Sequence, residues 1–220
     1  MNFRRFFRLP KRENESSPAH VTIEKRFQEI VSKTEPIPDS IYGPRYRCSL
    51  SLNDGTHIPC AVLQSKAKLL ELAKRRLNEE MSGKGKIAGP DPYEQILSVF
   101  VASGNRVNDY DIASVAASRY APPLALLEQI HGETTMAWTG WVFEMKDGKF
   151  FAFGSSFCME FLNLPEGYGF ADVVKVHNHS FLSDRGELIS LEQGGRLPDN
   201  YRTDNIFRER VYFTCYIDGL

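Results

Sequence analysis

The chain has 220 residues, of which 42% are hydrophobic and 25% charged, and this is an ordinary globular composition. A chain of this length buries enough surface to fold without a disulfide or a metal. No apolar run approaches the roughly 18 residues of a membrane span, and the basic N-terminus lacks the apolar stretch of a secretory signal. We therefore expect a soluble, cytoplasmic protein in a reducing compartment.

Charge is distributed unevenly along the chain. The first twelve residues hold five basic side chains and no acid, so the overall net charge of −1 leaves −6 for the remainder. Nucleic-acid-binding proteins usually carry a clustered basic face, and an acidic body lacks one. We therefore do not expect nucleic acid as a partner.

Residues 1–20 are predicted to form a basic arm and linker, and residues 21–220 a single α+β domain. In the arm, phenylalanines at helical spacing alternate with arginines, and Pro10 ends the run. This pattern suits peripheral membrane contact through residues 1–12, docking on an acidic partner or nucleic acid, or a solubilising tail without a specific role. The candidate interaction residues are Arg4, Arg5, Phe6, Phe7 and Arg8.

Alternating polarity predicts a first β-hairpin over residues 46–62. The tripeptide Asn-Asp-Gly at 53–55 forms its loop if the glycine is left-handed. This register places residues of like polarity opposite one another, and a shift of one residue would scramble the two faces. The predicted pairs are Leu52 with Thr56, Leu50 with Ile58, and Cys48 with Cys60.

The four cysteines lack the CxxC spacing of zinc ribbons and thioredoxin-like motifs. Cys48 and Cys60 are predicted to face one another on the apolar side of the first hairpin. In a reducing compartment we interpret both as buried, inert thiols, and Cys215 in the same way.

A second hairpin is predicted over residues 138–154, with Lys-Asp-Gly at 146–148 as its loop. One of its faces is strongly aromatic and the other is at least half apolar, so it is expected at the centre of the sheet. The predicted pairs are Met145 with Lys149, Phe143 with Phe151, and Trp141 with Phe153.

Helical spacing and capping residues predict several helices around these hairpins. Each hairpin leads into a helix that begins after a serine, and a last strand covers 210–217. The predicted fold class is therefore α+β: one antiparallel β-sheet, built from two hairpins plus a C-terminal strand and covered by several helices. The main predicted helices cover residues 66–81, 92–103, 109–120 and 122–131.

A long segment at 181–209 is rich in glycine and charge, with at most a short strand at 187–191. Loops of this length in a compact domain are usually functional or mobile. We therefore count it among the regions where function is expected.

The main chemical candidate is the pair His177 and His179, followed by Asp184. On a strand, residues two apart point the same way, so both imidazoles could hold one metal ion. With Asp184 and an upstream acid such as Glu144 or Glu160, they would form a zinc site that activates water for hydrolysis.

The same stretch, 169–177, also fits an amphipathic helix, and we favour this interpretation. In a helix, residues two apart lie about 200° apart around the axis, so His177 and His179 would not chelate one ion.

The sequence contains no complete catalytic set. It favours a non-catalytic interaction or regulatory protein with a protein partner, acting through the arm, an aromatic sheet face or the 181–209 segment. The alternative is a metal-dependent hydrolase that uses zinc bound by His177, His179 and Asp184.

Overall fold

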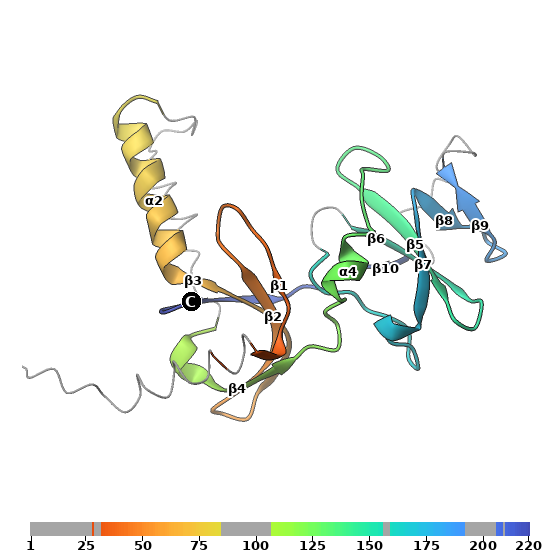
Figure 1. Ribbon diagram of the computed structural model, residues 1–220, viewed down its shortest axis with the longest axis horizontal. Helices are drawn as coiled ribbons and strands as arrows, with labels where there is room; N and C mark the ends of the chain where they lie inside the picture. Colours follow the sequence, from red (N-terminus) through yellow and green to blue (C-terminus); the bar gives the residue numbers. More distant parts are fainter. Residues whose placement is uncertain (1–27, 29–31, 85–106, 156–158, 192–205, 209) are drawn as a thin grey trace, which may run out of the picture.

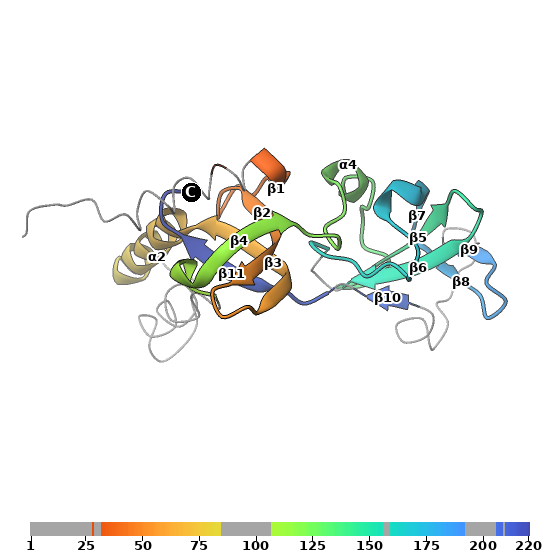
Figure 2. The same ribbon diagram turned by 90° about the horizontal axis from the view of Figure 1, so that it is seen from below.

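The computed structural model describes residues 28, 32–84, 107–155, 159–191, 206–208 and 210–220. Two main β-sheets lie end to end in Figure 1, and the 90° view in Figure 2 shows the same arrangement. The chain passes from the first sheet to the second after residue 117 and returns before residue 213. No helix in these residues is long and apolar enough to cross a membrane.

The first sheet has the strand order β1-β2-β3-β11, with β4 paired along β2. Strand β2 runs antiparallel to β1, β3 and β4, whereas β11 runs parallel to β3. This sheet is therefore mixed. Its strands are β1 (Pro36–Ile37), β2 (Arg45–Leu52), β3 (His57–Ser65), β4 (Ile112–Ala117) and β11 (Phe213–Ile217).

The second sheet has the strand order β10-β6-β5-β7, so the strands of the second hairpin are its two inner strands. Strand β5 is antiparallel to both neighbours, and β10 is parallel to β6. A small separate hairpin, β8–β9, follows β7. The strands are β5 (Thr139–Met145), β6 (Phe150–Ser155), β7 (Val173–Asn178), β8 (Ser180–Leu182), β9 (Leu188–Ser190) and β10 (Ile206–Arg208).

This mainly β architecture contradicts the predicted α+β fold. The two hairpins lie in different sheets, and the described residues contain only two α-helices, α2 (Lys66–Met81) and α4 (Leu124–Leu127). A hairpin pattern predicts pairing between its own two strands. It contains no information on which other strand completes each sheet, because that depends on long-range hydrogen bonds.

The loops of both hairpins are confirmed. Leu52 N donates to Thr56 O across the first loop, and Met145 N donates to Lys149 O across the second, each at 2.8 Å. The loop glycines Gly55 and Gly148 have φ values of 88° and 81°, a region that other L-residues rarely adopt. All three predicted pairs of the second hairpin are also found.

The first hairpin changes register between Cys48 and Leu50. Leu50 pairs with Ile58 as predicted, but Cys48 pairs with Ala61 and not with Cys60. An extra residue in one strand turns the side chains beyond it to the opposite face. The prediction that the two cysteines face one another is therefore wrong. Cys48 lies in the core of the first sheet, whereas Cys60 lies on the face toward the second sheet.

Cys48, Cys60 and Cys215 are nevertheless buried and unbonded to one another, as predicted. Burial raises the pKa of all three thiols, that of Cys215 to about 12. A buried thiol with a raised pKa stays protonated and unreactive near neutral pH.

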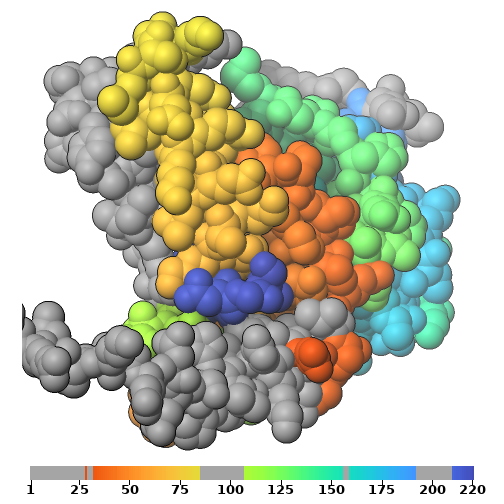
Figure 3. Space-filling model, turned by 60° about the vertical axis from the view of Figure 1, so that its left-hand side comes forward, coloured from red at the N-terminus to blue at the C-terminus, as the bar shows by residue number. Residues whose placement is uncertain are grey.

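The predicted helix 66–81 is confirmed as α2, and Ser65 Oγ accepts a hydrogen bond from Lys68 N at 3.4 Å. Figure 3 shows the C-terminal segment against the start of this helix, where Lys66 and Asp218 form an ion pair of 3.1 Å. This helix is predictable because its cap and its buried stripe both lie within its own sequence.

The other predicted helices are not found where they can be checked. Residues 109–120 form a short 3-10 turn (Asp109–Asp111) and then β4, and 122–131 contains only the single turn α4. No helix follows the second hairpin over 159–164. The helix predicted at 92–103 lies outside the described residues.

The helix interpretation of 169–177 is also wrong, because residues 173–178 form strand β7 along the edge of β5. Short apolar runs fit either period, and here the unpaired edge of β5 decides the outcome. The predicted strand 210–217 is found as β11, and the short strand expected at 187–191 as β9.

A buried polar contact joins the two sheets. Arg47 on β2 is only 4% exposed and donates from Nη1 to the Pro122 carbonyl at 2.6 Å. Glu160, 6% exposed, lies within 2.7 Å of Arg45 Nη1. Beside them, Phe161 packs on the outer face of β3. The two sheets therefore share an interface, called the junction below.

Candidate functional site

His177, on β7, is engaged on the surface of the second sheet. Its Nε2 lies 2.8 Å from Glu144 Oε2 on the neighbouring strand β5. The imidazole also meets the Phe150 ring edge to face, with 6.0 Å between centroids. This histidine thus has its own carboxylate partner.

His179 lies just beyond β7, in the left-handed region with φ 50°. The strand alternation that would align it with His177 therefore ends before it. Its Nδ1 is 3.2 Å from Thr134 Oγ1, and its ring centroid is 6.5 Å from that of His131.

Asp184 lies exposed in the turn between β8 and β9, and it bonds to neither histidine. Among the described residues, no group of three or more His, Cys, Asp and Glu side chains is placed to hold a metal ion. The arm residues Arg4, Arg5, Phe6, Phe7 and Arg8 lie outside the described residues.

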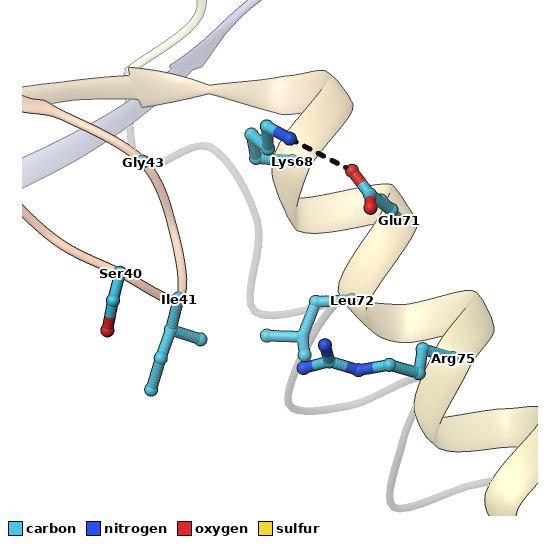
Figure 4. A pocket seen from close by; sticks show the side chains of 7 residues that line it. All are labelled: Ser40, Ile41, Gly43, Lys68, Glu71, Leu72 and Arg75. Atoms are coloured by element: carbon cyan, nitrogen blue, oxygen red, sulfur yellow. Dashed lines mark hydrogen bonds and ion pairs between the residues drawn. The ribbon is translucent and has the colours of Figure 1, made fainter.

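A groove of about 190 Å³ lies between α2 and the turn before β2 (Figure 4). Its cationic side chains already have acidic partners: Lys68 pairs with Glu71 at 3.2 Å, and Arg75 with Glu79 at 4.0 Å. The groove therefore has little unmatched charge to offer a ligand. It is lined by Ser40, Ile41, Gly43, Lys68, Glu71, Leu72 and Arg75.

A larger hollow, of about 440 Å³, lies at the junction. One wall is Arg119 and Tyr120, in the crossing segment after β4; the other is the loop 163–169, between β6 and β7. A backbone hydrogen bond from Leu162 N to Tyr120 O, 2.8 Å long, holds the two walls together. We call this the junction hollow.

Two guanidinium groups lie over the ring of Tyr120. The Cζ atom of Arg119 is 4.6 Å from the ring centroid, and that of Arg210 is 4.0 Å away. Arg119 also donates to Tyr120 Oη at 2.6 Å, and Arg210 donates to Asn163 Oδ1 at 3.3 Å. Cation–π contacts of this kind orient an arginine while leaving several of its N–H groups at the ring edge.

Neither arginine has a carboxylate partner within the part of the chain that the structure describes. Glu166 lines the junction hollow but forms no ion pair with described residues. Arg210 also lies beside the Cys60 thiol and partly offsets the increase in its pKa that burial causes. The hollow is thus lined by one arginine, Arg119, and one acid, Glu166, and Arg210 adds a second guanidinium group over the Tyr120 ring.

The opposite wall is held by Tyr168. Its ring packs edge to face on Phe151, with 4.8 Å between centroids. Its hydroxyl donates to Asp147 Oδ2 at 2.7 Å and accepts from Lys149 Nζ at 2.7 Å. These bonds lower the pKa of Asp147 and raise that of Lys149. The tip of the second hairpin thereby fixes this tyrosine in place.

The junction hollow is not apparent from the sequence, because its residues come from three distant segments. Arg119 and Tyr120 fell in a segment predicted as helical, and Arg210 began a predicted strand. The only local signals are an Arg-Tyr pair before Pro122 and the Pro-Glu-Gly-Tyr-Gly turn at 165–169.

No family model, curated protein or solved structure matches this chain.

Proposed function

We propose that this chain is a cytoplasmic, non-catalytic binding protein whose junction hollow recognises an acidic side chain in a segment of a partner protein. The observation that carries the proposal is the placement of Arg119 and Arg210 over the Tyr120 ring, without a carboxylate partner among the described residues.

The chemistry of guanidinium groups supports a carboxylate as the ligand. Each arginine offers five N–H donors in a planar fork, and its bonds to Tyr120 or Asn163 leave further donors for a ligand. A carboxylate accepts two parallel hydrogen bonds from such a fork. Because Tyr120 already orients both groups, little side-chain entropy is lost on binding.

The walls of the hollow support a protein segment as the source of that carboxylate. Tyr120, Tyr168, Leu164 and Pro165 give apolar surface, and Arg119 supplies the charge. Tyrosine and arginine are enriched at protein interfaces, where they contribute much of the binding energy. Glu166 reduces the positive charge of the hollow, which favours one carboxylate over a polyanion such as nucleic acid.

The hydrolase alternative, with zinc held by His177, His179 and Asp184, stays a prediction. Glu144 holds the first histidine, Thr134 and His131 contact the second, and Asp184 lies in a separate turn. No observation in the described residues favours it over binding.

The test uses short synthetic peptides that carry one glutamate flanked by leucine, proline and tyrosine, each paired with a glutamine copy. Fluorescence anisotropy measures their affinity for the chain. We expect glutamate peptides to bind about tenfold more tightly, since a charge-assisted hydrogen bond contributes about 1.5–3 kcal/mol. Arg119→Ala should abolish that preference.

Arg75→Ala is the matched control, because Arg75 is an exposed arginine with its own acidic neighbour on α2. It should retain the full preference for glutamate. Equal affinity for glutamate and glutamine peptides in the unsubstituted chain would contradict the proposal.

A further inference from the structure

The side chain of Asn178, at the end of β7, forms two hydrogen bonds with the segment that follows α4. Asn178 Oδ1 accepts from His131 N at 3.2 Å, and Asn178 Nδ2 donates to the Gln129 carbonyl at 2.7 Å. This double contact places His131 beside His179, the residue after Asn178. The two imidazole rings meet at 67°, with 6.5 Å between centroids.

The hydrogen bonds of Thr134 indicate which nitrogen of His179 is available. Thr134 Oγ1 accepts from Gly140 N at 2.9 Å and lies 3.3 Å from Gly140 O and 3.2 Å from His179 Nδ1. If the hydroxyl donates to Gly140 O, its second lone pair accepts a hydrogen bond from the His179 Nδ1–H group. This arrangement uses every hydrogen-bonding group of the hydroxyl, and it leaves Nε2 as an unprotonated ligand nitrogen.

The backbone around these rings has an unusual conformation. His179 and Ala137 have φ values of 50° and 55°, and Gly132 has φ 79°. Positive φ in residues other than glycine is sparsely populated and tends to cluster at functional sites. A Cβ atom at position 132 would lie 2.9 Å from His179 Nε2. Glycine there allows the backbone to pack closely against the His179 ring.

We propose that His131 and His179 form a two-histidine site for a divalent transition-metal ion, with water as its other ligands. Imidazole nitrogens suit zinc, nickel and copper, and a ligand histidine commonly donates its second ring N–H to a neighbouring oxygen. For His179 Nδ1 that oxygen is Thr134 Oγ1, 3.2 Å away. His131 is exposed, so its ring can turn to bring a nitrogen to the ion.

This site is independent of the junction hollow. In it, the second ligand beside His179 is His131, whereas the sequence suggested His177. His177 is held by Glu144 on β5, 2.8 Å away. No third His, Cys, Asp or Glu completes the set within the described residues. With water at the remaining positions, copper should bind most tightly among these ions, following the order of divalent-metal affinities.

The experiment is isothermal titration of the untagged full chain with Ni²⁺ at pH 7.5. The variants are His131→Ala, which alters an exposed side chain, and His179→Asn, which keeps a residue that tolerates left-handed backbone. His177→Ala is the matched control. It removes the neighbouring histidine two positions away, which the proposal leaves out of the site.

We expect one Ni²⁺ per chain, at least tenfold weaker binding in His131→Ala and in His179→Asn, and unchanged binding in His177→Ala. Absence of Ni²⁺ binding, equal binding in all variants, or a loss confined to His177→Ala would each overturn the proposal. His131→Ala decides the matter if His179→Asn fails to fold.

Discussion

The two hairpins have the same loop geometry but differ in the register of their strands. In both, a left-handed glycine ends the loop, and its N–H donates to the carbonyl of the residue before the loop, at 3.0 Å in the first and 2.9 Å in the second. Beyond the loop, β5 and β6 keep one register along their whole length. Strands β2 and β3 shift register before they reach Cys48.

This difference shows how far a loop controls the pairing of its strands. Loop geometry sets the first pairs, but a single inserted residue resets the faces farther along. In the first hairpin the shift lets β3 serve two cores: Ala61 and Leu63 face the core of the first sheet, and Cys60 and Val62 face the junction. The bulge is therefore part of how the two sheets are joined.

The largest expected effect comes from a disulfide that tests the shifted register. Ala61→Cys, combined with Cys60→Ser, places a thiol directly opposite Cys48. Paired strand residues lie within the Cα separation of a disulfide, so oxidation should link 48 to 61 and stabilise the fold by about 2–4 kcal/mol. Mass spectrometry of the digest and chemical denaturation measure the two results.

The unsubstituted chain is the control for this experiment. Under the same oxidation it should give no link between Cys48 and Cys60, since the two side chains lie on opposite faces. A Cys48–Cys60 disulfide formed in the native state would show that the first hairpin has the unshifted register of the second.

An intermediate effect is expected from the loop glycines. Gly55→Ala and Gly148→Ala should each lower the free energy of unfolding by about 1–2 kcal/mol, because alanine is strained at positive φ. A Cβ at either position meets no atom within 4 Å, so the cost arises from the backbone alone. Urea denaturation should give similar losses for both, and asparagine substitutions should cost less. A large difference between the two would mean that the loops are not equivalent.

The smallest expected effect concerns the aspartates of the two loops. A hydrogen bond from Thr56 N lowers the pKa of Asp54, and one from Tyr168 Oη lowers that of Asp147. A lowered folded-state pKa contributes stability above the unfolded value of about 3.9, and this is lost as pH falls through the folded pKa. Asp54→Asn and Asp147→Asn should therefore each flatten the decline of Tm between about pH 4 and pH 2.

Asp54 is bonded within its own loop, whereas the partner of Asp147 is a tertiary contact, Tyr168. Only Asp147→Asn should therefore loosen the wall of the junction hollow. The measurement is glutamate-peptide affinity at pH 7, which should fall slightly for Asp147→Asn and not for Asp54→Asn. Equal peptide affinities of the two variants would show that the tip of the second hairpin does not support the junction hollow.

The candidate sites illustrate the same limit of sequence reasoning. The residues at 177–179 are conspicuous in the sequence, but Glu144, Gln129 and His131, which contact them, come from other segments. The alternation of a strand suggested a shared site for His177 and His179. The backbone leaves the strand geometry at His179, and no residue pattern indicates that turn.

The sequence by itself determined the features that depend on neighbouring residues: the two loops and their first pairs, the limits of α2 with its Ser65 cap, and the burial of Cys48, Cys60 and Cys215. The tertiary structure alone decided the membership of each sheet. Segments 112–117 and 173–178 became strands because β2 and β5 each offered an unpaired edge, whose backbone groups need partners. The junction hollow and the His131–His179 contact follow from that pairing, since only the folded chain brings their distant segments together.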